Sequence, residues 1–302
     1  MVEDLLVWSI PMRTRFRGIE AREGVLVHGP AGWGEFSPFW DYDLAECVPW
    51  WRAAYEAAYG AWPHDQRVGV GLAEGAAATP LRQSVPVNVT VPAVGPERAA
   101  AIVRDSRGCR TAKVKVAEPG QTEADDLARV EAVRDTLGVG GLVRVDANGL
   151  WDVDTAVRMV ALLDRAAGGL EYVEQPCRTV EELAAVRRRV SVPVAADESI
   201  RRADDPLRVA RLEAADIAVL KVQPLGGVAA CLRIAEQIRL PVVVSSALET
   251  SVGLAAGLAL AAALPELPYA CGLATLSLLD GDVTSHPFRV VDGELAVARP
   301  EP

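Results

Sequence analysis

Three acidic residues stand where three successive β-strands are predicted to end. They are Asp146 in VRVDANG, Glu174 in EYVEQP and Asp197 in VAADES. The separations, 28 residues from 146 to 174 and 23 from 174 to 197, are each close to one strand-plus-helix unit. Taken singly, each acid is more typical of a helix cap or a salt bridge. The repeated spacing instead predicts that the three carboxylates meet at one end of a parallel sheet.

Three convergent carboxylates repel one another unless a cation lies between them. Ligands that are all oxygen suit a hard divalent ion, so Mg²⁺ is the expected metal, with Mn²⁺ as a substitute. No histidine lies near these positions, which disfavours zinc. The predicted metal ligands are therefore Asp146, Glu174 and Asp197.

Lysine is rare in this chain, since 28 of the 31 basic residues are arginines. Lys113 and Lys115 lie two residues apart in AKVKV, and Lys221 lies in LKVQPLGG. Mutual repulsion and partial burial favour a neutral amine in the first pair, which is the state that a general base requires. The alternative is a GC-biased genome with three surviving lysines, and composition alone does not decide between the two.

The positions of these lysines suit one kind of reaction. Lys113 and Lys115 fall on the second predicted barrel strand and Lys221 on the sixth, so they face each other across the barrel. A carboxylate substrate held by the metal would then have an ammonium group over each face. This arrangement fits removal of a proton from the carbon next to that carboxylate, because a metal stabilises the charge that develops.

Four further residues are candidates for substrate binding. Arg144 and Asn148 share a strand face with Asp146 and either contact the substrate or hold the carboxylate. Ser245 and Ser246, with the backbone N–H groups of a helix opening at Gly253, are expected to receive a second carboxylate. A plain strand-to-helix turn is the alternative for the two serines.

The elements that position these residues alternate short β-branched runs with longer amphipathic runs, as in repeated βα units. Seven helical patterns connect eight predicted strands, among them 123–137 and 179–189, the second opening with a capping box of Thr179 and Glu182. We predict a (β/α)₇β modified TIM barrel, a subclass of α/β fold. Its strands are 87–91, 112–116, 142–146, 170–174, 193–198, 216–222, 241–245 and 269–273.

The two ends of the chain differ from the barrel pattern. Residues 1–85 contain predicted strands at 5–9 and 24–28, a GPAGWGEF turn and a helix near 48–59. Residues 281–302 contain a hairpin around Asp292 and Gly293, expected to return to the N-terminal strands. The predicted domains are an α+β capping domain at 1–85, the barrel at 86–280 and the tail at 281–302. Residues 69–79 are the expected joint, and Arg13, Arg15 and Arg17 a charged loop that is either a solvated turn or a lid.

Composition narrows the class of partner. The chain has 302 residues, 50% of them hydrophobic, and a formal net charge of -10. That charge argues against a nucleic acid or an anionic membrane as partner, and the apolar run 253–264 is too short to span a bilayer. Five widely spaced cysteines without a CxxC pair indicate a reducing compartment. We expect a cytoplasmic enzyme that acts on a small-molecule carboxylate and has no obligate protein partner.

The KxK strand, the DANG, EQP and DES segments and the KxQPLGG strand together resemble the enolase superfamily, in its muconate-lactonizing-enzyme-like subgroup. The resemblance covers essentially the whole chain, with five motifs in order. It implies a divalent metal held by Asp146, Glu174 and Asp197, and Lys115 and Lys221 as the acid/base pair. The family's lid loop would fall at 12–23.

Within that subgroup, REGVLVHGPAGWGEFSPF (22–39) and SSALETSVGL (245–254) resemble the dehydratases that form o-succinylbenzoate. This implies dehydration of 2-succinyl-6-hydroxy-2,4-cyclohexadiene-1-carboxylate through an enediolate, a step of menaquinone synthesis. Lys115 would take the α-proton and return it to the departing hydroxide, with Lys221 as a fixed cation. Two alternatives remain open, a racemase or epimerase of N-acylamino acids or dipeptides on the same scaffold, and a non-catalytic binding barrel.

Overall fold

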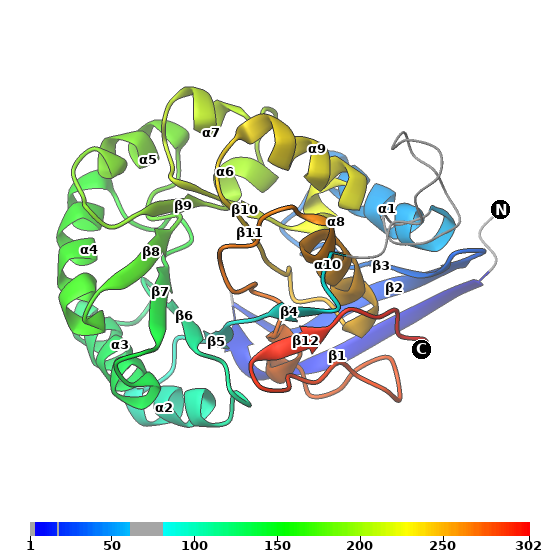
Figure 1. Cartoon of the computed structure of the whole chain (residues 1–302), viewed down its shortest axis with the longest axis horizontal. Coiled ribbons are helices and arrows are strands. Elements are labelled where there is room, and N and C mark those ends of the chain that lie inside the picture. The colour runs from blue at the N-terminus through cyan, green and yellow to red at the C-terminus, as the bar shows by residue number, and fades with distance from the viewer. Residues whose placement is uncertain (1–3, 17, 61–80) are drawn as a thin grey trace.

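The computed structural model describes residues 4–16, 18–60 and 81–302. Its larger part is a curled parallel sheet with the strand order β11-β10-β9-β8-β7-β6-β5. Helices surround the outside of this sheet (Figure 1). The strands are β5 (Val89–Val91), β6 (Thr111–Lys115), β7 (Leu142–Asp146), β8 (Leu170–Glu174), β9 (Val194–Ala196), β10 (Ile217–Leu220) and β11 (Val242–Val244).

The connections between these strands are helical, as the βα pattern predicts. Of the seven predicted helices, 123–137 corresponds to α3 (Glu123–Leu137) and 179–189 to α5 (Val180–Arg187), and the predicted capping box of Thr179 and Glu182 is present. The helices that follow β5 to β11 are α2 (Pro96–Arg104), α3 (Glu123–Leu137), α4 (Val153–Ala167), α5 (Val180–Arg187), α6 (Glu198–Arg201), α7 (Arg208–Arg211), α8 (Val222–Leu225), α9 (Val228–Ile238) and α10 (Ser251–Ala263).

The eighth predicted strand, 269–273, is reduced to isolated parallel bridges. Cys271 bridges Val87, and Gly272 bridges Ser245. The backbone N–H of Asn88 donates to the carbonyl of Cys271 at 2.9 Å, and that of Ser246 donates to Gly272 at 3.0 Å. This segment therefore joins the two edges of the seven-stranded sheet and closes the predicted barrel. Gly272 is required there, because a Cβ would lie 2.5 Å from the Ser245 hydroxyl oxygen.

The core lies on both sides of the barrel wall. Outward-facing strand residues pack against the helices in one large cluster of buried aliphatic side chains. Inside the barrel, apolar side chains fill the part that precedes the strand ends: Tyr172, Ala195, Ile217, Val219 and Val243. The interior is thus a packed floor of mainly apolar side chains, and the candidate catalytic groups lie at the carboxyl ends of the strands.

The N-terminal part is an antiparallel sheet of β1 (Asp4–Phe16), β2 (Ile19–Gly29) and β3 (Gly32–Phe36), against which α1 (Leu44–Tyr59) packs. The predicted charged loop was wrong for Arg13 and Arg15, which lie in β1, whereas Arg17 is outside the described residues. Exposed arginines alternate there with half-buried Met12, Thr14 and Phe16, which is the period of a strand. The expected lid at 12–23 is thus the end of the β1–β2 hairpin.

The C-terminal strand pairs with an earlier strand of the chain, but not with the one expected. β12 (Glu294–Ala296) pairs antiparallel with β4 (Ser84–Pro86) instead of with β1 or β2. Leu295 is buried by this pairing, whereas its neighbours are exposed. The predicted joint at 69–79 lies outside the described residues, and the bounds of the three predicted domains stay a prediction.

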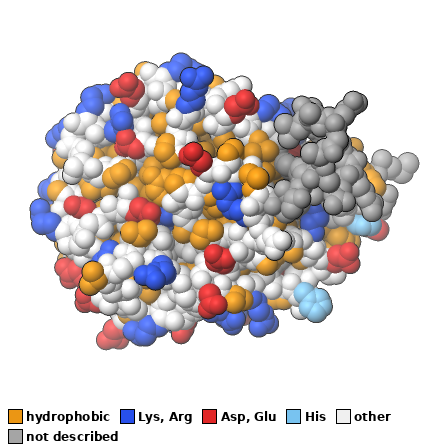
Figure 2. Space-filling model, in the orientation of Figure 1, with side chains coloured by type: hydrophobic (Ala, Val, Ile, Leu, Met, Phe, Trp, Pro, Cys, Tyr) orange, Lys and Arg blue, Asp and Glu red, His pale blue; other side chains and the backbone are white. Residues whose placement is uncertain are grey.

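The surface carries side chains of both charge signs (Figure 2). On the face drawn in Figure 2, positive and negative side chains of the described residues alternate around the rim, and apolar side chains gather over the middle of the barrel. That face has no broad basic surface of the kind that binds polyanions. No helix among the described residues is long and apolar enough to cross a membrane.

Candidate active site

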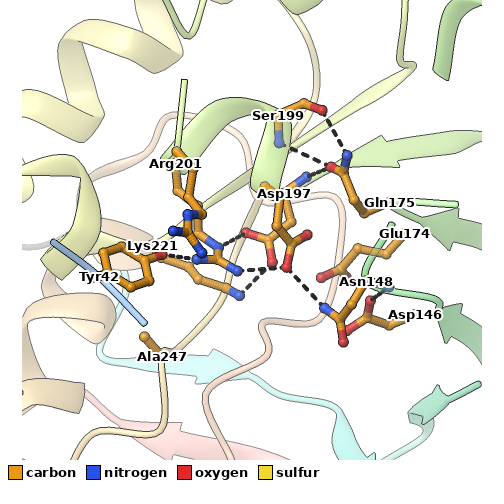
Figure 3. A network of polar contacts seen from close by, with 12 residues as sticks. Tyr42, Asp146, Asn148, Glu174, Gln175, Asp197, Ser199, Arg201, Lys221 and Ala247 are labelled. Atoms are coloured by element: carbon orange, nitrogen blue, oxygen red, sulfur yellow. Dashed lines mark hydrogen bonds and ion pairs between the residues drawn. The ribbon is translucent and has the colours of Figure 1, made fainter. Parts of the chain in front are cut away.

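The three predicted carboxylates lie side by side at the carboxyl ends of adjacent strands. Asp146 and Glu174 are the last residues of β7 and β8 and are partners in the strand register. Asp197 follows β9 directly and begins α6. All three side chains are buried, and Figure 3 shows them around a common space. The spacing argument is therefore correct about where the acids meet.

Each of the three lysines forms an ion pair with one of these acids. The Nζ of Lys113 donates to both oxygens of Glu174 at 3.0 Å, and the Nζ of Lys221 donates to Asp197 at 2.7 Å. Lys115 pairs with Asp146 at a longer distance, 3.9 Å. The second and sixth strand positions place Lys115 and Lys221 on opposite sides of the barrel mouth, as predicted.

The acids change the protonation expected of the lysine pair. Burial disfavours the ammonium form of Lys113, but Glu174 and Asp146 outweigh it, so the pKa of Lys113 is raised. The expectation that mutual repulsion keeps this amine neutral was therefore wrong for Lys113. Burial and repulsion from Asp146 and Asp197 raise the pKa of Glu174 to about 7 despite Lys113. Burial opposes ionisation of Asp197 as well, but Arg201 and Lys221 overcome it and hold its pKa below the usual range.

The acids have the chemistry of a site for a hard divalent cation, but the lysines occupy their oxygens. Within the described ranges, no group of three Asp, Glu, His or Cys side chains is gathered so that it could hold a metal ion as it stands. Three buried carboxylates on consecutive strands, without a sulfur or imidazole donor, nevertheless fit a cation that prefers oxygen. A metal would replace the ammonium groups as the positive charge between them.

A small cavity adjoins these groups and is lined in part by the N-terminal part of the chain. Its volume is about 40 Å³, well below the roughly 300 Å³ of a typical ligand pocket. Phe16, at the end of β1, and Phe39 are the lining residues from the N-terminal part. The lining residues are Phe16, Phe39, Thr90, Lys113, Lys115, Asp146, Asn148, Lys221, Ser245, Ser246, Ala247, Leu248, Gly272 and Thr275.

Arg144 lies away from this cavity, on the floor of the barrel. Its guanidinium forms an ion pair with Glu171 at 2.5 Å and donates to the carbonyl of Ala270 at 2.7 Å. It also stacks on Tyr172. Strand alternation correctly placed Arg144 on the face of Asp146, but two residues nearer the amino end of β7, and Arg144 is not among the residues that line the cavity. The structure therefore does not bring Arg144 together with the other substrate candidates.

The other three substrate candidates line the cavity. Asn148 has a φ of 45°, donates its backbone N–H to Asp146 and its amide to Glu198. Ser246 shares a hydrogen bond of 2.7 Å with Thr275, and Ser245 lies beside Gly272. Asn148 comes from the end of β7 and the two serines from the end of β11, and all three line the cavity beside the lysines.

The expected contribution of the helix opening near Gly253 was wrong. The backbone N–H of Gly253 donates to the carboxylate of Glu35 at 3.0 Å, and that of Thr250 donates to the same carboxylate. Ser251 likewise donates to Asp282. Side chains of this chain therefore already use these N–H groups.

Sequence reasoning missed two residues that hold Asp197. The Nε of Arg201 donates to Asp197 at 2.9 Å, and its other nitrogens bond to Glu198 and the hydroxyl of Tyr42 (Figure 3). The side-chain oxygen of Gln175 accepts the backbone N–H of Asp197 at 3.0 Å. Their positions gave a signal, because Gln175 follows Glu174 in EQP and Arg201 lies one helical turn after Asp197.

The buried carboxyl group of Glu249, next to the cavity-lining residues Ala247 and Leu248, makes the free energy of unfolding depend on pH. Burial, followed by repulsion from Glu35, raises the pKa of Glu249 to about 7. One oxygen accepts the N–H of Ala247 at 2.7 Å, and the other has no hydrogen-bond partner among the described residues. The folded state therefore holds its proton more tightly than the unfolded state.

We expect this proton to stabilise the folded state fully below about pH 4.5, and the stabilisation to be lost as the pH rises through about 7. The loss in the free energy of unfolding is at most roughly 3 kcal/mol. Glu249→Gln should unfold at higher guanidinium concentration than the parent at pH 8, with little difference at pH 5. Glu131→Gln, an exposed change on α3, is the control. Equal shifts at both pH values would contradict the prediction.

Two family models match most of the chain. The model described as enolase C-terminal domain-like matches residues 97–302, and the one described as enolase N-terminal domain-like matches residues 7–58. Among solved structures, an L-Ala-D/L-Glu epimerase from Bacillus subtilis superposes with a TM-score of 0.79 and 23% identity, covering 99% of this chain and 96% of the other. A muconate lactonizing enzyme from Pseudomonas fluorescens also gives 0.79, with 22% identity and coverage of 99% and 95%. At this identity the two structures support the fold alone.

Relatives in sequence are much more similar. A protein of Thermobifida fusca named o-succinylbenzoate synthase is 68% identical over 97% of this chain and 86% of its own length. A protein of Mycolicibacterium smegmatis with the same name is 57% identical over 100% of this chain and 88% of its own length. Similarity at this level extends over nearly the whole chain.

Proposed function

We infer the reaction from the premise that this chain belongs to the enolase superfamily. It catalyses the o-succinylbenzoate synthase reaction, the dehydration of 2-succinyl-6-hydroxy-2,4-cyclohexadiene-1-carboxylate to o-succinylbenzoate in menaquinone biosynthesis. It is therefore a carbon-oxygen lyase. One observation in the structure supports this reaction best, namely that all three lysines of the chain line one cavity and each pairs with one of three buried acids.

Membership of the superfamily implies a divalent metal ion, and we propose that it is Mg²⁺, with Mn²⁺ as a substitute. Asp146, Glu174 and Asp197 would hold it. When bound, the ion would neutralise the substrate carboxylate and lower the energy of the negative charge that develops there. The lysines would lose their present partners in part, which favours release of a proton from an ammonium group.

Lys115 is the proposed general base. Lys113 is held by both oxygens of Glu174 at 3.0 Å, whereas the ion pair of Lys115 with Asp146 is longer, at 3.9 Å. The amine of Lys115 would take the proton from the carbon that bears the carboxylate and become an ammonium. It would then give this proton to the departing hydroxyl group, so that water leaves, the ring becomes aromatic and the neutral amine is restored.

Lys221 would act from the opposite side as a fixed positive charge. Its Nζ lies 2.7 Å from Asp197, whose other oxygen is held by Arg201. A cation held in place stabilises developing negative charge without reorganising during the reaction. Aromatisation supplies driving force, so no second proton transfer is required.

The substrate would be oriented by Asn148, Ser245 and Ser246, whose side chains line the same cavity. The serine hydroxyls are proposed to bind the succinyl carboxylate without help from the helix that follows. The substrate is a small molecule, and we propose that the enzyme needs no protein partner. A cytoplasmic location stays a prediction, and the five free cysteines support it.

The second candidate is an epimerase on the same scaffold. It has one supporting observation, because lysines on opposite sides of the cavity suit proton transfer to either face of a carbon. An L-Ala-D/L-Glu epimerase is among the similar structures, but at 23% identity. The two relatives at 57% and 68% identity favour the dehydratase.

A turnover assay tests the proposed function. We expect the purified protein with Mg²⁺ to convert the cyclohexadiene carboxylate to o-succinylbenzoate at a rate typical of enzymes, about 1 to 1000 per second. The appearance of the aromatic product is followed by its absorbance. Absence of product, together with exchange of the α-proton of an N-acylamino acid in D₂O, would replace the dehydratase with the racemase.

A further inference from the structure

Two segments that resemble the o-succinylbenzoate-forming dehydratases lie far apart in the sequence but meet in the fold. Residues 22–39 run through β2 and β3 of the N-terminal sheet, and residues 245–254 follow β11 of the barrel. They meet in a buried polar contact directly behind the cavity. Apart from the two serines, neither segment has a part in the proposed chemistry.

Arg22 is the centre of this contact. Its side chain is buried, although it lies on a strand whose neighbouring residues are exposed. The Nε donates to the carbonyl of Leu248 at 3.2 Å, and NH2 donates to Ala247 at 3.2 Å and to Ser37 at 2.5 Å. One guanidinium thus fixes backbone from both segments, which the rigid fork of arginine can do and a lysine cannot.

The residues that Arg22 holds are part of the cavity wall. Ala247 and Leu248 line the cavity, and so does Phe39, whose ring lies 4.4 Å beneath the guanidinium carbon. Leu248 has a φ of 64°, a left-handed conformation that a leucine adopts only when the surrounding structure enforces it. The bond from Arg22 to its carbonyl is one such constraint.

Two buried acids complete the contact. Glu35 accepts the backbone N–H groups of Thr250 and Gly253, and Glu249 accepts that of Ala247. Arg22 lowers the pKa of both acids, against the larger effect of burial. Loss of Arg22 would therefore leave carbonyl groups without their donor and two acids without a nearby cation.

The position of this wall relative to the acids indicates which part of the substrate meets it. The three proposed metal ligands lie at the ends of the third, fourth and fifth barrel strands, whereas Ala247 and Leu248 follow the seventh strand. The reacting carboxylate belongs at the acids and lysines, so the succinyl chain reaches the opposite wall. Contacts with a group far from the reacting atoms are the same in the bound substrate and in the transition state. They therefore affect substrate binding more than the chemical step.

We propose that Arg22 is a positioning residue that fixes the cavity wall formed by Phe39, Ala247 and Leu248 and thereby sets affinity for the succinyl chain. The assignment of the succinyl chain rests on the proposed dehydratase function. The positioning of the wall does not depend on that function.

The test compares Arg22→Met and Arg22→Lys with the unchanged protein. We expect KM for the cyclohexadiene substrate to rise about tenfold or more in Arg22→Met while kcat falls less than about threefold, which a general loss of structure would not produce. Arg22→Lys should give an intermediate KM because it keeps the charge but not the fork. Arg98→Met, an exposed change on α2, is the control and should leave both constants unchanged.

Hydrogen exchange measured by mass spectrometry gives a reading that needs no turnover. In Arg22→Lys, residues 245–250 should exchange faster than in the unchanged protein, whereas residues 111–116 of β6 should exchange at the same rate. If Arg22→Met does not fold, both KM and hydrogen exchange are measured on Arg22→Lys instead.

Three outcomes have distinct meanings. No turnover by the unchanged protein would overturn the proposed function, and faster exchange confined to 245–250 would still support positioning by Arg22. Unchanged KM and unchanged exchange in folded Arg22 variants would overturn the proposal. A fall in kcat with KM unchanged would also overturn it, because Arg22 would then act on the reacting groups.

Discussion

Lys115→Ala is expected to lower turnover by about 10³- to 10⁴-fold, at the upper end of the range for loss of a general base. Lys115 lines the cavity, is buried, and lies opposite Lys221 across the barrel. Alanine leaves no group there that can take the α-proton or return it to the hydroxyl group. The measurement is kcat for formation of o-succinylbenzoate at saturating substrate and Mg²⁺.

The control must separate the base from the fold. Lys115→Ala should keep its cooperative thermal unfolding, and exchange of the substrate α-proton with D₂O should be lost together with dehydration. Arg158→Ala, which removes an exposed ion pair with Glu123 on the outside of the barrel, should retain full activity. Retention of a tenth or more of the activity in Lys115→Ala would assign the base elsewhere, with Lys113 as the next residue to test.

Removal of divalent metal is expected to abolish turnover while the protein stays folded. Loss of the ion should lower activity by at least about 10³-fold, because the developing negative charge loses its main stabilisation. The fold should persist, because each of the three acids already pairs with one of the three lysines. Turnover and far-UV circular dichroism are compared before and after treatment with EDTA, and again after adding Mg²⁺ or Mn²⁺.

A ligand variant tests the proposed site itself. Glu174→Gln removes a carboxylate between Lys113 and the space for the ion, and calorimetry should show Mg²⁺ binding at least about tenfold weaker than in the unchanged protein. Arg158→Ala serves again as the control. Full activity in the presence of EDTA, or unchanged Mg²⁺ affinity in Glu174→Gln, would rule out this set of ligands.

The β1–β2 hairpin is one place where the sequence pattern led to a wrong prediction of local structure. Arg13 and Arg15 suggested a loop because charge was considered without alternation, although Met12, Thr14 and Phe16 between them carry the period of a strand. The eighth strand was overestimated for a different reason. Its residues have strand character, but its bridges to the sheet are only that of Cys271 to Val87 at one edge and that of Gly272 to Ser245 at the other, among the described residues.

The site shows the same limit at the level of contacts. Spacing placed Asp146, Glu174 and Asp197 together, but it contained no information about which lysine would face which acid. Arg144 lies on the same strand face as Asp146 but nearer the amino end of the barrel, where it pairs with Glu171. The N–H group of Gly253 already donates to Glu35. Glu35 is 218 residues from Gly253 in the sequence, so no local pattern connects them.

The sequence by itself determined the barrel, the order of its strands and the set of groups that can do chemistry. It could do so because strand and helix periods are local, and because side chains at the ends of parallel strands must share one edge. The tertiary structure alone decided the ion pairs of the lysines, the place of Phe16 and Phe39 in the cavity wall, and the contact of Arg22 with Ala247 and Leu248. These depend on contacts between residues that are 24 to 61 positions apart for the ion pairs and more than 200 apart for Arg22, where burial and partner charges fix both geometry and protonation.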